Sequence, residues 1–365
     1  MKIKEIVYLL EDLAPLALQE SYDNAGLVVG NHDDDVNSAI LCLDVTEDVV
    51  EEAIRKKADL IISHHPVIFS KLDKLTGSSH IERIIIKAVR QGIALYSAHT
   101  NIDKVMGGVN SRICEKLGLK KTRILSPAAG ILRKLVVFVP SSHAQEVREA
   151  IFSAGAGHIG EYEQCSFNVE GEGSFRGSEH SDPFTGKAGV LHFEKEVRVE
   201  TIYPAYLEEH VLKKMVDSHP YEEIAYDIYP LNNKYDKAGM GMAGNLDMPL
   251  AAKDFLQLLK KIFRTGVIRH SNFTGSKKIS NVAVCGGSGR FLISAARKAN
   301  ADIYVTGDLK YHDFFNADEK MVIADIGHFE SEQFTLEIFH ELLKKKLPNF
   351  AVHFSEVKTN PIHYF

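Results

Sequence analysis

Short, continuously apolar segments alternate with helical patterns near the start of this 365-residue chain. Strand-like runs lie at 39–43, 59–63 and 93–97, and helical patterns at 46–57 and 79–91 separate them. Strands that are apolar throughout are covered on both faces, and strands that are joined through helices are typically parallel. The alternation therefore predicts an α/β fold with a largely parallel sheet.

The same alternation returns after residue 240. Its predicted strands and C-terminal helix lie at 281–285, 301–305, 321–325 and 329–346. The segment 58–65 aligns with 301–308, since both begin with Ala-Asp, continue as an apolar strand and end in polar residues. We therefore predict a duplicated α/β core with mixed, largely parallel sheets, assembled from residues 1–128 and 237–365.

Residues 129–236 follow a different pattern. Predicted strand, helix, strand, strand, helix and strand lie at 134–140, 144–153, 161–176, 188–203, 206–217 and 225–230. This order is typical of ferredoxin-like α+β folds. We predict an inserted ferredoxin-like domain, and we interpret 232–236 and the Gly-rich segment after it as the return linker.

Composition excludes several classes of function. With 49 acidic and 43 basic residues the net charge is −6, so no basic surface for nucleic acid is indicated. No segment approaches the roughly 20 apolar residues of a membrane span, and the N-terminus predicts an amphipathic helix rather than a signal peptide. The four cysteines form no CxxC pair, which fits free thiols in a reducing compartment. We expect a cytoplasmic protein without membrane or nucleic-acid partners.

Side chains that bind metals follow the predicted strands in both blocks. Ligands in open α/β sheets gather beyond the carboxyl ends of the strands, so a fold that joins the two blocks would bring these side chains together. In the second block the histidine and the carboxylate are four residues apart, which places them on one helical face. The candidate metal ligands are His64, His65, Asp103, His328 and Glu332.

Each of these motifs also has a structural explanation when it is taken alone. His64 and His65 before a proline equally fit two exposed loop histidines. Asp103 fits a helix N-cap or turn residue, and Glu332 fits a carboxylate favoured by a helix N-terminus. His99 could be a ligand, a hydrogen-bonding partner of a ligand, a general base or a buried histidine with satisfied nitrogens.

Further polar residues follow other strands. Asp308 and His312 could line the same pocket, with His312 transferring protons, although a polar loop and a helix cap explain them as well. Asp44 is a similar candidate. The segment 286–290, rich in glycine, could cradle a phosphate, but we prefer to interpret it as a tight turn from strand to helix.

Imidazole and carboxylate ligands without thiolates suit Zn, Fe, Mn, Co or Ni. Two such ions about 3.5–4 Å apart would hold a bridging hydroxide, which is a nucleophile at neutral pH. The residues therefore predict two divalent metal ions per chain and metal-assisted hydrolysis, with His99 and His312 as candidates for proton transfer.

Together, the motifs resemble a known family, the GTP cyclohydrolase 1 type 2 homologues, also called the Nif-three-like family. The matching segments lie at 23–27, 63–66, 98–103, 306–313 and 327–332. The middle block is similar to the insert of the longer bacterial members, which looks like small PII and CutA proteins. His219 to Glu223 match that insert.

The resemblance implies a ligand assignment in which His65 and Asp103 hold one ion, His64 and His328 hold the other, and Glu332 bridges both. It also implies a homohexamer, a trimer of dimers that forms a toroid, and a nucleotide-like substrate. In a cyclohydrolase reaction the hydroxide would attack C8 of a purine. In a phosphoester reaction the ions would bind the phosphate oxygens.

Two other classes of function fit the same residues. A regulatory or metal-handling hexamer would bind and exchange the ions without turnover. An assembly scaffold with a vestigial site would contain less than stoichiometric metal. A panel of nucleotides and phosphodiesters, tested with each metal, separates the hydrolases from these alternatives.

Overall fold

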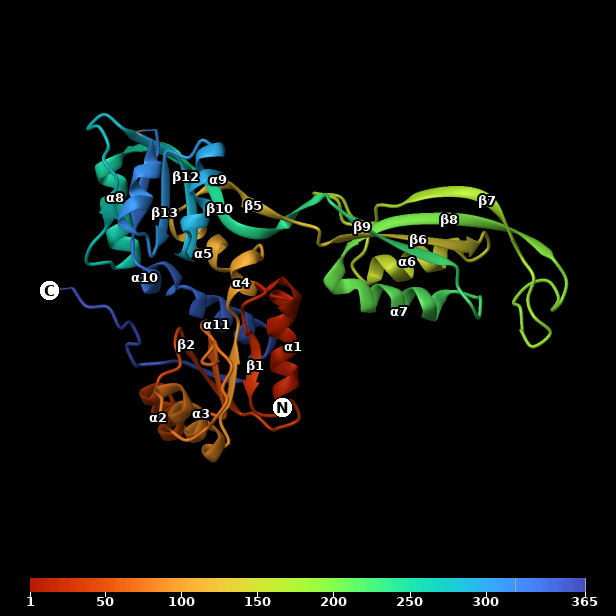
Figure 1. Cartoon of the computed structure of the whole chain (residues 1–365), viewed down its shortest axis with the longest axis horizontal. Coiled ribbons are helices and arrows are strands. Elements are labelled where there is room, and N and C mark those ends of the chain that lie inside the picture. Colours follow the sequence, from red (N-terminus) through yellow and green to blue (C-terminus); the bar gives the residue numbers. More distant parts are fainter. Residues whose placement is uncertain (319, 365) are drawn as a thin grey trace. The chain divides into compact units, whose positions relative to one another are not determined.

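A computed structural model describes residues 1–318 and 320–364. Glu319 and Phe365, the last residue of the predicted core range, lie outside the described residues. The chain divides into two compact units. Unit 1 comprises Met1–Pro127 and Lys237–Phe365, and unit 2 comprises Ala128–Asp236 (Figure 1). Every helix in the described part of the chain is too short or too polar to cross a membrane.

The first sheet of unit 1 has the strand order β1-β4-β3-β2-β15. Its strands are β1 (Gly26–Val29), β2 (Ser38–Cys42), β3 (Leu60–Ser63), β4 (Ala94–Ser97) and β15 (Ala351–Phe354). All neighbours are parallel except β1, which runs antiparallel to β4. All residues of β3 and β4 are buried, as the uninterrupted apolar runs predict.

Helices cover this sheet. They are α1 (Ile3–Leu13), α2 (Glu47–Lys56) and α3 (His80–Gln91). The first half of the chain also contains a 3-10 turn η1 (Leu16–Leu18) and the short helices α4 (Thr100–Lys104) and α5 (Val109–Lys116), which lie outside this layer. The side chains of Thr46 and Ser79 cap the N-termini of α2 and α3 by accepting a backbone N–H. The apolar sides of α2 and α3 pack against Ile40, Ile61 and Leu95 of the sheet.

The second sheet of unit 1 has the order β11-β14-β13-β12-β10-β5. Its strands are β5 (Lys120–Ala129), β10 (Lys234–Ala251), β11 (Arg269–His270), β12 (Lys278–Ser288), β13 (Ile303–Gly307) and β14 (Val322–Asp325). The helical segments here are α8 (Ala252–Phe263), η3 (Arg290–Leu292), α9 (Ile293–Lys298), η4 (Tyr311–Ala317), α10 (His328–Glu332) and α11 (Thr335–Lys346).

The two sheets share a local order that places the candidate ligands. The series β2-β3-β4 and β12-β13-β14 both run parallel, with neighbours in chain order. The aligned segments 58–65 and 301–308 contain the middle strands β3 and β13. Between the sheets, α11 packs on α1, α5 and β2, and α5 packs on β12. This packing brings the C-terminal segment back to the first sheet.

The structure corrects two predicted elements. The Gly-rich segment that we interpreted as a linker belongs to strand β10, where Ala238 and Met242 are buried. Its Gly239 lies so close to β5 that an added Cβ would collide with the carbonyl of Ser126. The predicted helix 329–346 is interrupted between α10 and α11. The side chain of Gln333 donates to Glu330 O at 2.9 Å, an oxygen that a continuous helix would reserve for a backbone N–H.

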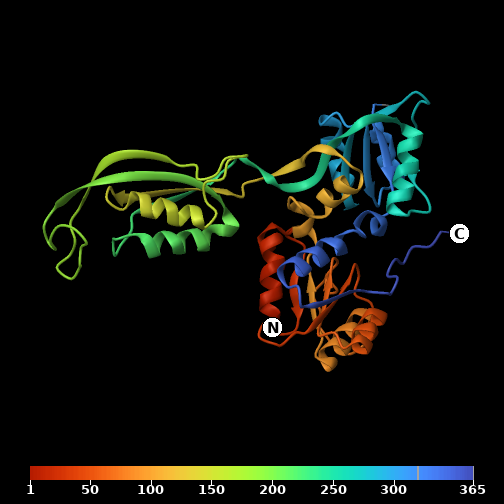
Figure 2. The same ribbon diagram turned by 180° about the vertical axis from the view of Figure 1, so that it is seen from behind.

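Unit 2 contains one antiparallel sheet of order β7-β8-β6-β9. Along the chain its elements are β6 (Leu132–Pro140), α6 (Ala144–Ser153), β7 (Phe167–Phe175), β8 (His192–Pro204), η2 (Ala205–Leu207), α7 (Glu208–Ser218) and β9 (Tyr226–Leu231). Helices α6 and α7 lie together on one face of the sheet (Figure 2). The core of this unit contains Val137 and Val139 of the sheet and Val147, Val211 and Met215 of the helices.

Candidate metal centre

His64 and His65 follow directly after β3, and both imidazoles reach the same site. The backbone N–H of His64 donates to Cys42 O at 3.2 Å, and that of His65 donates to Leu43 O at 2.9 Å. Ser63 Oγ donates to His65 O at 2.8 Å, which curls the chain at the end of the strand. The two ring centroids are 4.8 Å apart. The expected turn before Pro66 therefore lets neighbouring residues share one site.

His64, His65 and His328 form what we call the histidine cluster. In each ring Nδ1 lies within hydrogen-bond distance of an oxygen. These oxygens are Ala98 O for His64 (2.8 Å), Asp44 Oδ1 for His65 (2.8 Å) and Asp308 Oδ2 for His328 (2.6 Å). Since Nδ1 then carries the proton of the neutral ring, Nε2 presents its lone pair to the site.

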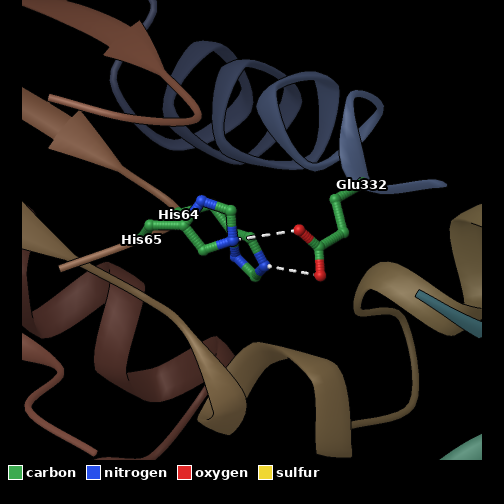
Figure 3. A group of neighbouring side chains, drawn as sticks. All are labelled: His64, His65 and Glu332. Atoms are coloured by element: carbon green, nitrogen blue, oxygen red, sulfur yellow. Dashed lines mark ion pairs between the residues drawn. The ribbon is translucent and has the colours of Figure 1, made fainter. Parts of the chain in front are cut away.

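The Nε2 atoms of the cluster face buried carboxylates. Those of His65 and His328 each lie 3.0 Å from Glu332 Oε2, and 3.3 Å from each other. His64 Nε2 lies 3.5 Å from Glu332 Oε1 and 3.8 Å from Asp103 Oδ1. Figure 3 shows His64 and His65 approaching the two carboxylate oxygens of Glu332. Lone pairs that face carboxylate oxygens repel them unless protons or a cation lie between.

Buried atoms at the centre of this group lack hydrogen-bond partners. Among the described residues these atoms include His64 Nε2, Asp103 Oδ1 and Glu332 Oε2. Burying such groups is costly unless something else satisfies them. The ligand atoms of His64, His65 and Glu332 lie within 4.8 Å of one another, so this cluster can hold a metal ion.

The contacts pair the side chains differently from the assignment that the family resemblance implies. Asp103 lies nearest His64, with Glu332 Oε1 beside them, and His328 lies nearest His65, with Glu332 Oε2 beside them. Glu332 is common to both groups.

The electrostatics of the site follow from burial and from the close charges. Burial lowers the pKa of His65, but hydrogen bonds to Asp44 and Glu332 outweigh it and raise this pKa to about 9. The same competition raises the pKa of His328 to about 11. Burial and the neighbouring Glu332 raise the pKa of Asp103 well above its usual value. For Glu332 the surrounding histidines outweigh burial and hold its pKa well below the usual range. The site therefore favours added positive charge.

The glycines at the C-terminal end of β12 leave room for the side chain of Glu332. Gly287 has φ +61°, and a Cβ on it would collide with Glu332 Oε1. Its backbone N–H donates to Ser331 Oγ at 2.9 Å, and that of Gly286 donates to Asn110 Oδ1 at 3.0 Å. These two amides are already used within the fold, which argues against a phosphate cradle at this turn.

His99 lies beside the cluster, with its ring centroid 5.4 Å from those of His64 and His65. Its Nδ1 is 2.7 Å from Asp23 Oδ1. Burial raises the pKa of Asp23, but hydrogen bonds from His99 and Thr100 outweigh it and lower this pKa to about 2. No role was predicted for Asp23 from the sequence, although its segment, 23–27, is among the family motifs.

Of the remaining candidate residues, two lie at the histidine cluster and one does not. Asp44 and Asp308 bind the cluster histidines His65 and His328 through Nδ1, as described above. His312 lies in η4, is exposed, and stacks with Tyr311 and Phe315. The structure therefore does not bring His312 to the cluster.

A cavity of about 560 Å³ opens onto this candidate site. His65, His99, Asp103, His328 and Glu332 line its floor, and its wall includes exposed aromatic side chains, namely Tyr22, Phe69 and Phe291. No Lys or Arg is among the described residues that line it. The cavity offers aromatic side chains beside a cluster of imidazoles and carboxylates.

Comparisons with known proteins place the whole chain in one family. The family model Duf34/NIF3 (NGG1p interacting factor 3) matches residues 1–361. A protein of Bacillus subtilis named GTP cyclohydrolase 1 type 2 homolog is 38% identical, over 99% of this chain and 98% of its own. The crystal structure of a Bacillus cereus protein related to NIF3 has a TM-score of 0.86 at 39% identity and covers 100% of this chain and 99% of that one. The Staphylococcus aureus protein SA1388 has a TM-score of 0.76 at 29% identity, with the same coverage. This chain belongs to the Duf34/NIF3 family.

Proposed function

We propose that this chain is a hydrolase that uses two divalent metal ions and acts on a nucleotide-like substrate. One observation carries the proposal. Three imidazoles have Nδ1 bound to an acceptor and direct Nε2 at two buried carboxylates, and several of the facing atoms lack partners. Imidazole nitrogen and carboxylate oxygen suit Zn, Fe, Mn, Co or Ni, and Asp44 and Asp308 orient two of the imidazoles.

The contacts support one division of the ligands. His64 and Asp103 would hold one ion, His65 and His328 the other, and Glu332 would offer one oxygen to each. Two divalent ions so placed would supply Lewis acidity and lower the pKa of water. This division differs from the pairing that the family resemblance implies. It is supported by two distances, 3.8 Å between Asp103 Oδ1 and His64 Nε2 and 3.3 Å between His328 Nε2 and His65 Nε2.

His99 is the residue best placed to move a proton. Asp23 binds its Nδ1, so that Nε2 remains for the cavity that His99 lines. The aromatic wall suits a flat heteroaromatic ring, since ring stacking is favourable with Phe and Tyr. A triphosphate would be expected to meet Lys or Arg, and the described lining contains neither. The aromatic wall therefore supports recognition of the ring, and in the absence of basic residues from the described lining the phosphates of a nucleotide would have to be bound by the metal ions or remain outside the cavity.

The test combines metal content with turnover. Protein purified without chelator should contain two divalent ions per chain, and Glu332→Gln should lose both. Glu115→Gln, which changes an exposed carboxylate outside the cavity, is the matched control. Metal-loaded protein is then assayed with GTP, other nucleotides and phosphodiesters. Loss of guanine absorbance without phosphate release would support ring opening, and phosphate release would show the phosphoester reaction instead.

A regulatory or metal-handling role is the alternative. It is supported by the same unsatisfied atoms, which explain metal binding without any substrate. Exchangeable metal with no turnover on the whole panel would favour it. A His65→Ala variant that stays folded but loses a turnover measured for the wild type would refute it.

We also propose that the chain forms a homohexamer and that unit 2 is an inserted ferredoxin-like domain on a duplicated core. The order β7-β8-β6-β9 with both helices on one face supports the ferredoxin-like assignment. On the opposite face, toward the end of the sheet away from the connection between β7 and β8, Phe167 and Tyr229 are 67% and 48% exposed, which suits a surface covered on assembly. Light scattering of the full-length protein checks the mass of the assembly.

A further inference from the structure

Unit 2 has a cavity of its own, of about 550 Å³. It opens on the face of the sheet away from α6 and α7. Val137 and Val139 pack in the core with these helices, so Phe138 between them points to the other face. Val197 also packs against the core, which places the neighbouring Glu196 on the cavity side. The loop after β7 and the segment 221–225 complete the wall. A volume of this size is typical of small-molecule sites.

Aromatic rings form part of this wall. The ring of Tyr221 lies 5.9 Å from that of Phe175 and 6.3 Å from that of Phe184, centroid to centroid. Phe184 belongs to the loop and is 53% exposed, although it is apolar. The rings therefore come from a strand, a loop and the segment before β9, and they face a common space.

The charged groups around the cavity are mostly acidic. Its lining contains Glu196, Glu222 and Glu223 against one basic residue, Arg176, which is exposed. Glu196 Oε1 accepts a hydrogen bond from the hydroxyl of Tyr221 at 2.9 Å. Burial and this carboxylate raise the pKa of Tyr221 well above its ordinary value. The carboxylate is thus held at the edge of an aromatic ring.

The fold holds Tyr221 and Glu196 in place. The backbone N–H of Tyr221 donates to His219 Nδ1 at 3.1 Å, and His219 Nε2 donates to Phe138 O at 3.0 Å. On β7, Gly173 lies diagonally across from Glu196 and leaves space for its carboxylate, since a Cβ there would collide with Glu196 Oε2. The acidic and aromatic groups are therefore positioned by the backbone of unit 2.

We propose that this cavity binds a small organic cation that carries a quaternary ammonium group. Aromatic faces attract such cations, and the carboxylates complement their charge without requiring the hydrogen bonds that an ammonium with N–H groups would seek. A cation with an alkyl surface, which is only weakly hydrated, also suits a wall of aromatic rings better than a hydrated metal ion does. The site lies within unit 2 and does not depend on the proposed function of the metal centre.

The test is calorimetric titration of the full-length protein with choline and with 3,3-dimethyl-1-butanol, its uncharged isostere. Choline should bind saturably, and the isostere about tenfold more weakly or not at all. Phe184→Leu and Glu196→Gln should each weaken choline binding by about tenfold. Phe184 is exposed, so its replacement leaves the core intact, and the Gln side chain can still accept from Tyr221. Glu163→Gln, an exposed carboxylate outside the cavity, is the control and should bind as the wild type does.

Three results would overturn the proposal. Equal affinity for choline and its isostere would show that the cavity binds apolar groups and does not recognise the positive charge. Unchanged choline affinity in both variants would place the binding elsewhere. Absence of saturation, with Phe184→Leu changing the mass of the assembly in solution, would show that a second copy of the chain occupies the cavity.

Discussion

Histidines in the two units show two different ways of burying an imidazole. In unit 2 both nitrogens of His219 are used within the fold, Nε2 by Phe138 O and Nδ1 by the N–H of Tyr221. In unit 1 each member of the histidine cluster has a fold partner at Nδ1 and turns Nε2 toward Glu332 or Asp103. The contrast shows that the second nitrogen, and not burial, separates a structural histidine from a candidate ligand.

Burial alone would not have made this distinction. His64 is 0% exposed and His219 is 8% exposed. Local sequence would not have made it either, because His65 and His219 both precede a proline. The difference becomes visible only when the acceptors Asp44 and Asp308 and the facing carboxylate of Glu332 are in place.

Among the variants that test this difference between the two kinds of histidine, Gly287→Ala should have the largest effect, because it changes the carboxylate that the histidine cluster faces. The added Cβ would push Glu332 away from the cluster, and the backbone strain at φ +61° would add to this. We expect metal affinity to fall by about 100-fold or more, beyond the loss typical of groups that only orient a ligand. Measurement is by competition with a chelator of known affinity.

Gly92→Ala provides a matched control for that variant. Gly92 ends α3 at φ +66°, but an added Cβ there would meet nothing within 4 Å. Both variants should lose about 1–3 kcal/mol of unfolding free energy through backbone strain. Only Gly287→Ala should lose metal, and equal metal content in both variants would contradict the placement of Glu332.

A smaller effect is expected from Asp308→Asn. The amide still accepts from His328 Nδ1–H but no longer carries the charge that makes the ring more basic. Metal affinity should fall about 10–100-fold, with the fold retained. The substitution Asp318→Asn, in a residue after η4 that is exposed and outside the cavity, should leave metal affinity unchanged. An unchanged affinity in Asp308→Asn would mean that His328 is not a ligand.

Much of this arrangement could be predicted from the sequence. The apolar runs around Leu60 and Ile303 identified buried parallel strands, because such strands carry no polar alternation. The polar residues after them were expected to meet, since parallel strands end at the same edge. The fold brings His64 and His65 together with Glu332, although Glu332 is far from them in sequence.

The rest depends on tertiary contacts that leave no local signal. The turn from strand to helix predicted at 286–290 is present, since β12 ends at Ser288 and η3 begins at Arg290. Nothing in the sequence indicated, however, that the glycine at 287 also makes room for a side chain from α10. The segment around Gly239 looked like a linker because close packing against a neighbouring strand and flexibility both favour glycine. His312 was named because it follows a strand, but η4 carries it away from the cluster.

His219→Ala tests the histidine of unit 2, whose two nitrogens are both used within the fold. It would leave Phe138 O and the N–H of Tyr221 without their buried partner, at a cost of about 1–3 kcal/mol in the stability of unit 2. Hydrogen exchange should show faster opening of β6 and β9, whereas the metal content of the protein should not change. Loss of metal in this variant would break the distinction between the two kinds of histidine.

The smallest effect concerns His99, whose Nδ1 is held by Asp23 and whose Nε2 is left to the cavity. The pKa of Asp23 is lowered from 3.8 to about 2. The charge of Asp23 therefore stabilises the fold fully at pH values above 3.8, and this stabilisation is lost as the pH falls through about 2. Asp23→Asn should therefore cost up to about 2 kcal/mol at pH 7. The difference in unfolding free energy from the wild type should stay constant down to about pH 5 and narrow as the pH falls from about 4 toward 2, as denaturant unfolding at each pH would show. A difference that does not change with pH would mean that Asp23 holds His99 by its shape and hydrogen bonds alone, and that the charge beside this imidazole does not contribute to folding.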